Sequence, residues 1–205
     1  MALTSLTPLS LLRPALFLDK DGTLLEDLPY NSDPARMRFA PGAAEAIRRL
    51  APLGVPMIVV SNQSGVAFGH FDIAALEGVG ERLCAMFAEC GAKLEGFFCC
   101  PHHPDGSVAE YAFRCDCRKP APGLLYRAAN EHGIDLQRSW LIGDILDDIE
   151  AGKRAGCRGV LLCNGNETEW RSGLFRVPDH LVRDLDEAAR LVAGAWSGAP
   201  SRALA

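Results

Sequence analysis

The stretch Leu16-Phe17-Leu18-Asp19-Lys20-Asp21-Gly22-Thr23 passes from apolar residues directly into two carboxylates and a glycine. An apolar run such as Ala15 to Leu18, without polar alternation, is typical of a strand buried on both faces of a parallel sheet. Asp19 and Asp21 then lie at the carboxyl end of that strand, where open α/β sheets place ligand sites. Because residues i and i+2 of an extended segment point the same way, both carboxylates can face one site. The alternative is an ordinary turn with an aspartate helix cap, since Asp and Gly are common in turns.

Strand-like and helix-like segments alternate along the rest of the chain. This alternation predicts an α/β fold with a doubly wound, Rossmann-like parallel sheet of about five main strands. We expect the first and fourth strands to be neighbours, which would bring Asp144 beside Asp19 and Asp21. After Ala15 to Leu18, the strands are expected at Val55 to Val60, Leu94 to Cys99, Trp140 to Ile142 and Gly159 to Leu162. The helices are expected at Gly42 to Leu50, Asp72 to Cys90 with Asp72 as its cap, Pro122 to His132, Asp147 to Ala155 and Asp184 to Ala195.

The length of 205 residues suits one compact domain. We expect a loose leader over residues 1–14, a single domain over residues 15–195, and a flexible tail over residues 196–205, which is rich in Ser, Gly, Ala and Pro. Residues 164–177 form a predicted loop to which the sequence assigns no role.

The net charge of -5 argues against nucleic acid as the main partner, because phosphate backbones are bound by basic surfaces. It leaves room for a small phosphorylated substrate held by a local basic pair. No stretch approaches the roughly 18 consecutive apolar residues of a membrane span. In the first fourteen residues the leucines mostly precede Arg13, the reverse of a signal peptide's order. We expect a cytoplasmic, monomeric protein with no membrane partner.

Eight cysteines do not predict disulfides here, since the chain can form a core and shows no secretory signal. Four of them lie in apolar segments and are predicted to be small core residues: Cys84, Cys90, Cys157 and Cys163. The other four gather around one loop: Cys99, Cys100, Cys115 and Cys117.

Two short motifs in that loop are typical of a metal site. They are Cys100-Pro101-His102-His103 and Cys115-Asp116-Cys117. Three thiolates and one imidazole would make a closed tetrahedral zinc site of the structural kind. Such a site would hold in place a loop that otherwise lacks secondary structure. His102 and His103 compete for the position of the imidazole ligand, and reduced cysteines on a polar loop are the alternative to a metal site.

Polar side chains follow four of the predicted strands or lie in the loops after them. Carboxylates from two strands would form an oxygen-rich pocket suited to Mg²⁺. A hydroxyl and a lysine opposite them suit the oxygens of a phosphoryl group, whose transfer depends on positioning and charge neutralisation. Taken singly, Ser61 could be a turn residue and Lys119 a solvated charge. The full set is Asp19, Asp21, Ser61, Arg118, Lys119, Asp144, Asp147 and Asp148.

Four motifs in order resemble those of the haloacid dehalogenase-like phosphohydrolases. They are Asp19-x-Asp21-Gly22-Thr23, Ser61, Lys119 and Gly143-Asp144-x-x-x-Asp148. The resemblance covers Ala15 to about Asn164 and implies a phosphatase that forms an aspartyl-phosphate. Asp19 would be the nucleophile. The side chain of Asp21 would be the general acid and base.

The resemblance also implies an obligatory Mg²⁺ ion, held by Asp19, the backbone carbonyl of Asp21, and Asp144. Ser61 and Lys119 would hold the phosphoryl oxygens, and Asp148 would orient Lys119 or a metal-bound water. The remaining predicted contacts are with the substrate outside the transferred group, through Asn62 and Arg118.

Three further segments look like the subfamily of heptose bisphosphate and histidinol-phosphate phosphatases. They are Ser61-Asn62-Gln63-Ser64-Gly65, Cys100-Pro101-His102-His103-Pro104 and Cys115-Asp116-Cys117-Arg118-Lys119-Pro120. The resemblance implies a fold without a cap domain, with selection by loops 24–40, 64–70 and 100–118. It also implies zinc ligation by Cys100, His102, Cys115 and Cys117, with His102 preferred over His103.

Within this subfamily the expected reaction is removal of the 7-phosphate of D-glycero-D-manno-heptose 1,7-bisphosphate. Two positions depart from the pattern of the heptose enzymes, since Phe68 stands where a basic residue is expected and Ile145 where a lysine is expected. Histidinol phosphate or another small sugar phosphate is therefore an alternative substrate. A catalytically inactive, zinc-stabilised binding module is a second alternative, from a different class of protein.

Overall fold

The computed structural model describes residues 12–197. Residues 1–11 of the expected leader and residues 198–205 of the expected tail lie outside the described residues. The last part of the expected leader is hydrogen-bonded to the domain, because the Arg13 N–H donates to the Gly133 carbonyl at 3.1 Å and Arg13 forms a bridge with Ile134. At the other end, helix α5 (Leu185–Ser197) extends two residues beyond its expected end.

A six-stranded parallel sheet in the order β3-β2-β1-β4-β5-β6 forms the centre of the molecule. The first five strands confirm the predicted doubly wound sheet. The sixth is a three-residue edge strand whose middle residue, Leu181, is 58% exposed, so it lacks the apolar run that reveals a buried strand. The strands are β1 (Leu16–Leu18), β2 (Met57–Asn62), β3 (Leu94–Cys100), β4 (Trp140–Gly143), β5 (Arg158–Leu162) and β6 (His180–Val182).

Strand β1 lies between β2 and β4, with Leu16 paired to Met57 on one side and to Trp140 on the other. All three residues of β1 are buried, as the unbroken apolar run predicts. The expected neighbour relation of the first and fourth strands is therefore confirmed. The chain order reverses at this point of the sheet, which places the carboxyl ends of β1 and β4 at the switch point where such folds bind ligands.

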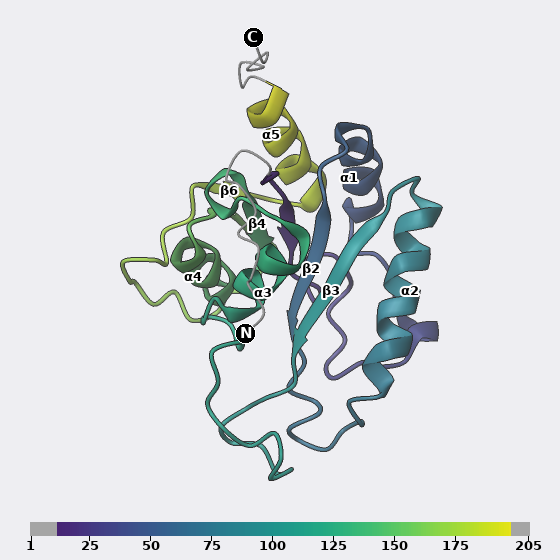
Figure 1. Cartoon of the computed structure of the whole chain (residues 1–205), viewed down its shortest axis with the longest axis vertical. Helices are drawn as coiled ribbons and strands as arrows, with labels where there is room; N and C mark the ends of the chain where they lie inside the picture. Colours follow the sequence, from purple (N-terminus) through teal and green to yellow (C-terminus); the bar gives the residue numbers. More distant parts are fainter. Residues whose placement is uncertain (1–11, 198–205) are drawn as a thin grey trace, which may run out of the picture.

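Helices cover both faces of the sheet in three layers (Figure 1). Alternate strand residues face opposite layers, so that Leu16 and Leu18 join one cluster and Phe17 the other. The first cluster contains α1 (Ala43–Leu50), α2 (Ala75–Glu89) and α5, and the second contains α3 (Gly123–His132) and α4 (Leu146–Ala155). In the part of the chain that the structure describes, no helix is long and apolar enough to cross a membrane.

Two local predictions are wrong. Helix α2 begins at Ala75 with Ala74 as its N-cap, because Asp72 lies in a preceding turn and its carbonyl accepts from the Ala75 N–H at 2.9 Å. Cys84 and Cys163 are exposed rather than in the core, which the apolar character of their segments does not reveal. An amphipathic helix and the end of a strand both contain positions that face solvent.

Substitution of Phe87 and of Leu174 tests the packing of the hydrophobic core. Phe87 on α2 is completely buried, so we expect Phe87→Ala to lower the free energy of unfolding by about 3–5 kcal/mol through lost burial and a residual cavity. Leu174 is 88% exposed, and Leu174→Ala should change the free energy of unfolding by less than about 0.5 kcal/mol. Urea denaturation of both variants measures the difference, and equal effects would contradict this packing.

Candidate active site

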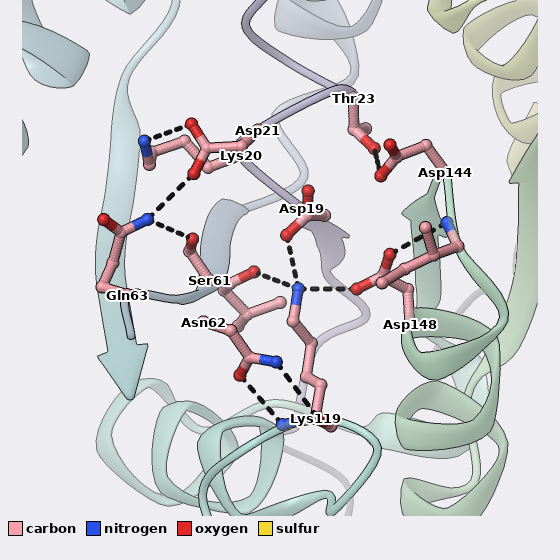
Figure 2. A network of polar contacts seen from close by, with 12 residues as sticks. Asp19, Lys20, Asp21, Thr23, Ser61, Asn62, Gln63, Lys119, Asp144 and Asp148 are labelled. Atoms are coloured by element: carbon pink, nitrogen blue, oxygen red, sulfur yellow. Dashed lines mark hydrogen bonds and ion pairs between the residues drawn. The ribbon is translucent and has the colours of Figure 1, made fainter. Parts of the chain in front are cut away.

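The carboxyl ends of β1, β2 and β4 meet the loop before α3 around a cavity of about 230 Å³ (Figure 2). The cavity brings together seven of the residues predicted from the sequence to form the site. Asp19 follows β1, Ser61 is the penultimate residue of β2, and Asp144 follows β4, so strand ends far apart in sequence supply the walls of the cavity. The predicted residues that line it are Asp19, Asp21, Ser61, Asn62, Lys119, Asp144 and Asp148.

The Lys119 ammonium occupies the centre of the site. Its Nζ donates to Asp19 Oδ1. The same Nζ donates to the Val60 carbonyl at 3.0 Å and lies 2.6 Å from Asp148 Oδ1. Lys119 is 3% exposed. Burial by itself would lower the pKa of Lys119, but the Asp148 and Asp19 carboxylates outweigh burial and raise that pKa above its ordinary value. The lysine is therefore held as a cation between two carboxylates.

Asn62 holds the backbone of Lys119. Its Nδ2 donates to the Lys119 carbonyl at 3.1 Å, and its Oδ1 accepts from the Lys119 N–H at 3.0 Å. This pair of hydrogen bonds connects the end of β2 to the loop that carries the lysine. Asn62 thus has a positioning contact in the structure, and its contact with a substrate stays a prediction.

Asp144 is held by two donors and a close glycine. Thr23 Oγ1 donates to Asp144 Oδ1 at 3.0 Å, and Asn166 Nδ2 donates to Asp144 Oδ2 at 2.7 Å. Gly22 has a φ of 81°, and a Cβ there would lie 2.2 Å from Asp144 Oδ2. Only glycine combines this left-handed conformation with so close an approach. The Gly-Thr pair after Asp21 therefore positions a carboxylate from another strand.

Oxygen atoms of Asp19, Asp144 and Asp148 lie within 4.8 Å of one another, and all three residues are buried. Burial, with the nearby Asp19 charge adding to it, raises the pKa of Asp144 to about 8. Burial also raises the pKa of Asp148, to about 6, although Lys119 opposes the shift. Such a cluster needs more positive charge than one lysine supplies. Its oxygen atoms fit a hard divalent cation such as Mg²⁺, which Asp19 and Asp144 would hold.

Asp21 lies apart from this cluster. Lys20 Nζ donates to Asp21 Oδ1 at 2.5 Å, and Gln63 Nε2 donates to Asp21 Oδ2 at 2.9 Å and to Ser61 Oγ at 2.8 Å. The Ser61 oxygen accepts in this contact, so its O–H is still available as a donor. Burial raises the pKa of Asp21, and the neighbouring Lys20 ammonium opposes that shift.

Arg118 lines a neighbouring cavity of about 500 Å³ together with Arg114 and Arg154, and Lys119 lines both cavities. Arg118 Nη1 donates to the His102 carbonyl at 3.4 Å. The structure therefore places Arg118 beside the carboxylate site and outside the cavity that contains Asp19. Its predicted contact with the part of a substrate away from the transferred group stays a prediction.

The four predicted zinc ligands converge at the start of the same loop. Cys100 Sγ lies 3.5 Å from Cys115 Sγ and 3.2 Å from Cys117 Sγ, and His102 Nδ1 lies 3.3 Å from Cys117 Sγ. Hydrogen bonding from the Cys100 thiol, and then from Cys115 and His102, lowers the pKa of Cys117 to about 5. A ready thiolate among sulfur and imidazole ligands fits a tetrahedral Zn²⁺ site.

His103 is outside this cluster, because its Nδ1 accepts from the Asp105 N–H at 3.2 Å. The geometry therefore favours His102, as the family pattern predicts. Cys117 also lies two residues before Lys119, so a metal bound to this cluster would fix the segment that carries the central lysine.

Four residues that complete the site were absent from the sequence-based set: Lys20, Gln63, Asn164 and Asn166. Asn164 Nδ2 donates to the Gly22 carbonyl at 2.7 Å, so the start of the 164–177 loop closes over the turn after β1. A lysine between two carboxylates directly after a buried strand was an available signal for Lys20. The two asparagines had none, since polar residues are ordinary in loops.

The fold and the site together define a class. A parallel sheet that presents buried carboxylates, a hydroxyl and a lysine at its switch point is suited to metal-assisted transfer of a phosphoryl group. A family model described as HAD-hydrolase-like matches residues 116–188.

Relatives extend that match over most of the chain. The D-glycero-beta-D-manno-heptose-1,7-bisphosphate 7-phosphatase of Yersinia pestis is 42% identical over 142 residues, 69% of this chain and 76% of the relative. The enzyme of the same name from Pasteurella multocida is 33% identical over 89% of this chain and 98% of its own. The chain belongs to the haloacid dehalogenase-like phosphatases, in the subfamily of these heptose bisphosphate enzymes.

Solved structures agree with this assignment. A HAD-like protein from Mesorhizobium loti is 36% identical and superposes with a TM-score of 0.78 over 93% of this chain and 90% of its own. The D,D-heptose 1,7-bisphosphate phosphatase of B. bronchiseptica, solved with magnesium and phosphate, is 28% identical with a TM-score of 0.72 over 89% of this chain and 99% of its own.

The cysteine cluster predicts one zinc ion per chain in protein purified without chelator, measured by elemental analysis. Cys115→Ser should lose most of that zinc and make loop 100–118 more sensitive to proteolysis, since metal binding orders the loop. Cys99→Ser is the matched control, because Cys99 adjoins Cys100 but lies outside the cluster. Zinc-free wild-type protein would refute the site.

Proposed function

We propose that this protein is a Mg²⁺-dependent phosphomonoester hydrolase that acts through an aspartyl-phosphate on Asp19. The observation that carries the proposal is the buried group of Asp19, Lys119 and Asp148, with Asp144 beside it, at the switch point of the sheet. Lys119 neutralises charge next to Asp19, where a phosphoryl group would approach. The relatives at 42% and 33% identity carry the name of such a phosphatase.

In the first half of the reaction an Asp19 carboxylate oxygen attacks phosphorus, and the bond from phosphorus to the leaving oxygen breaks with its electron pair on that oxygen. Asp21 gives its proton to the leaving oxygen as the bond breaks. Lys119 and the Ser61 hydroxyl hold the phosphoryl oxygens during transfer. A Mg²⁺ ion held by Asp19, the Asp21 carbonyl and Asp144 would supply the charge that lets a carboxylate approach a phosphate dianion.

In the second half, water attacks the phosphorus of the aspartyl-phosphate. Asp21, now ionised, takes a proton from that water, and inorganic phosphate leaves as the Asp19 carboxylate is restored. One carboxylate thus serves as acid and then as base. Asp148 keeps Lys119 in place in both halves of the reaction, because one of its carboxylate oxygens lies 2.6 Å from the ammonium and the other accepts from the Ile145 N–H at 3.3 Å.

We assign the 7-phosphate of D-glycero-D-manno-heptose 1,7-bisphosphate as the group removed, because relatives that match most of this chain are named for that reaction. Arg118 and Asn62 would contact the sugar phosphate outside the reacting group. The retained charge would face the arginine-lined cavity beside Lys119. The enzyme would act as a monomer in the cytoplasm, where thiolates stay reduced and available to zinc.

Histidinol phosphate is the second candidate, favoured by an aromatic group at the loops over the site. Tyr30 stacks on His70 with ring centroids 4.2 Å apart, and Phe68 lies 4.8 Å from His103. These rings come from loops 24–40, 64–70 and 100–118. A planar imidazole could stack on these rings.

The nucleophile assignment predicts that wild-type protein with Mg²⁺ hydrolyses a generic aryl phosphate and that Asp19→Asn reduces turnover to background. The variant should keep its fold, since amide and carboxylate have nearly the same size, and circular dichroism checks this. An active Asp19→Asn would disprove the nucleophile. Inactivity of metal-replete wild type on every phosphate ester would favour the zinc-stabilised binding module.

A panel with the two candidate substrates decides the substrate. We expect kcat/KM for the heptose bisphosphate to exceed that for histidinol phosphate by at least about tenfold, equivalent to ~1.4 kcal/mol of transition-state binding. Phe68→Ala should change the histidinol phosphate value more than the heptose value if the rings contact imidazole. Higher kcat/KM on histidinol phosphate would overturn the heptose assignment.

A further inference from the structure

Lys20 is a buried charge for which the reaction described above has no role. Its side chain is 1% exposed, although it follows the nucleophile position directly. A buried ammonium is costly unless it is paired and hydrogen-bonded. Among the described residues the one side-chain partner recorded for Lys20 is Asp21, at 2.5 Å. The free-energy cost of burying the Lys20 ammonium is therefore offset by its ion pair with Asp21, the carboxylate proposed as general acid and base.

The two oxygens of Asp21 are held by different residues. Oδ1 accepts from Lys20, and Oδ2 accepts from Gln63, which is itself 5% exposed. Two donors on opposite oxygens restrict rotation of the carboxylate about its terminal torsion, which is otherwise broad. In Figure 2 Asp21 faces Lys20 and Gln63, away from the group around Lys119.

Lys20 and Gln63, which supply the two donors, are themselves held by backbone hydrogen bonds. The Lys20 carbonyl accepts from the N–H groups of Leu24 and Leu25 at 3.1 and 2.8 Å, which closes the turn after β1. The Gln63 N–H donates to the Cys100 carbonyl at 2.7 Å, and its amide also donates to Ser61 Oγ. The orientation of Asp21 is thus set from β1 on one side and from the end of β2 on the other.

We propose that Lys20 and Gln63 are positioning residues that hold the Asp21 carboxylate in the orientation in which it protonates the leaving oxygen. The inference rests on the proposed phosphatase reaction and adds to it two residues that need not touch the substrate. Lys119 and Asn62 act on the phosphoryl side, and Lys20 and Gln63 act on the leaving-group side. Gln63 touches both sides, because its amide also donates to Ser61 Oγ, whereas Asp21 is the one side-chain partner of Lys20 among the described residues. Lys20 therefore gives the cleaner kinetic separation of the two sides.

The dependence of rate on the leaving group tests this separation. An alkyl phosphate needs its leaving oxygen protonated, whereas 2,4-dinitrophenyl phosphate does not, because dinitrophenolate leaves unaided. Since kcat/KM reports the steps up to formation of the aspartyl-phosphate, it isolates the acid role of Asp21 from its later role as base. Lys20→Met should lower kcat/KM on an alkyl phosphate by about 10²-fold, and on dinitrophenyl phosphate by less than about threefold.

Asn62→Leu is the matched control, because Asn62 is a neighbour of Gln63 that holds Lys119. Asn62→Leu should lower kcat/KM by the same factor on a simple alkyl phosphate and on dinitrophenyl phosphate, because neither ester carries the sugar that Asn62 is proposed to contact. Adding Lys20→Met to Asp21→Asn should cause no further loss on the alkyl phosphate, since residues that act through one group are non-additive. Equal losses on both substrates for Lys20→Met, or full additivity with Asp21→Asn, would overturn the proposal.

If Lys20→Met does not fold, Gln63→Leu carries the same test. It should lower kcat/KM on the alkyl phosphate at least about tenfold more than on dinitrophenyl phosphate, since any loss through its contact with Ser61 is common to both esters. A leaving-group-independent loss in Gln63→Leu would overturn the proposal. Failure of the phosphatase assignment itself gives a different result, namely wild-type protein that hydrolyses neither ester with Mg²⁺.

Discussion

The contact on which the site depends is the Lys119 ammonium buried between Asp19 and Asp148. Each of these three charged groups would be costly inside a protein alone, and together they are tolerable because each neutralises another at hydrogen-bond distance. Burial and the neighbouring carboxylates make ionisation of Asp144 unfavourable and raise its pKa, and a divalent cation would offset that cost. The arrangement thus places the Lys119 ammonium beside Asp19, the carboxylate proposed as the nucleophile.

Strand β2 and the cysteine cluster both contribute to the position of Lys119. Asn62 binds its backbone, the Val60 carbonyl accepts from its ammonium, and the cysteine cluster ends two residues before it. The lysine lies in a long loop, where a flexible side chain would otherwise be mobile. A zinc ion in that cluster would give the loop the rigidity that a strand gives to Asp19. A zinc ion in the cysteine cluster would therefore contribute to positioning Lys119 in the proposed active site.

The loops over the site have a different character from the site itself. The site contains buried charges in close pairs, whereas the loops carry a group of rings in contact with one another: Tyr30, Phe68, His70 and His103. In the proposed function, the reaction is carried out by the buried charges and the substrate is selected by the loops. A family that keeps the buried charges can change its substrate by changing the loops alone.

The sequence by itself predicted the five main strands of the sheet, the neighbour relation of the first and fourth strands, the carboxylates at the switch point and the four residues of the cysteine cluster. Apolar runs and ligand spacings are local signals, and the expected neighbours β1 and β4 follow from the topology of parallel sheets. It did not reveal β6, whose three residues form a half-exposed edge, or the start of α2. Only the tertiary structure decided the contacts between distant loops. Asn166 on Asp144, Gln63 on Asp21, and Arg118 outside the main cavity all depend on how loops pack, and no periodicity in the chain records that.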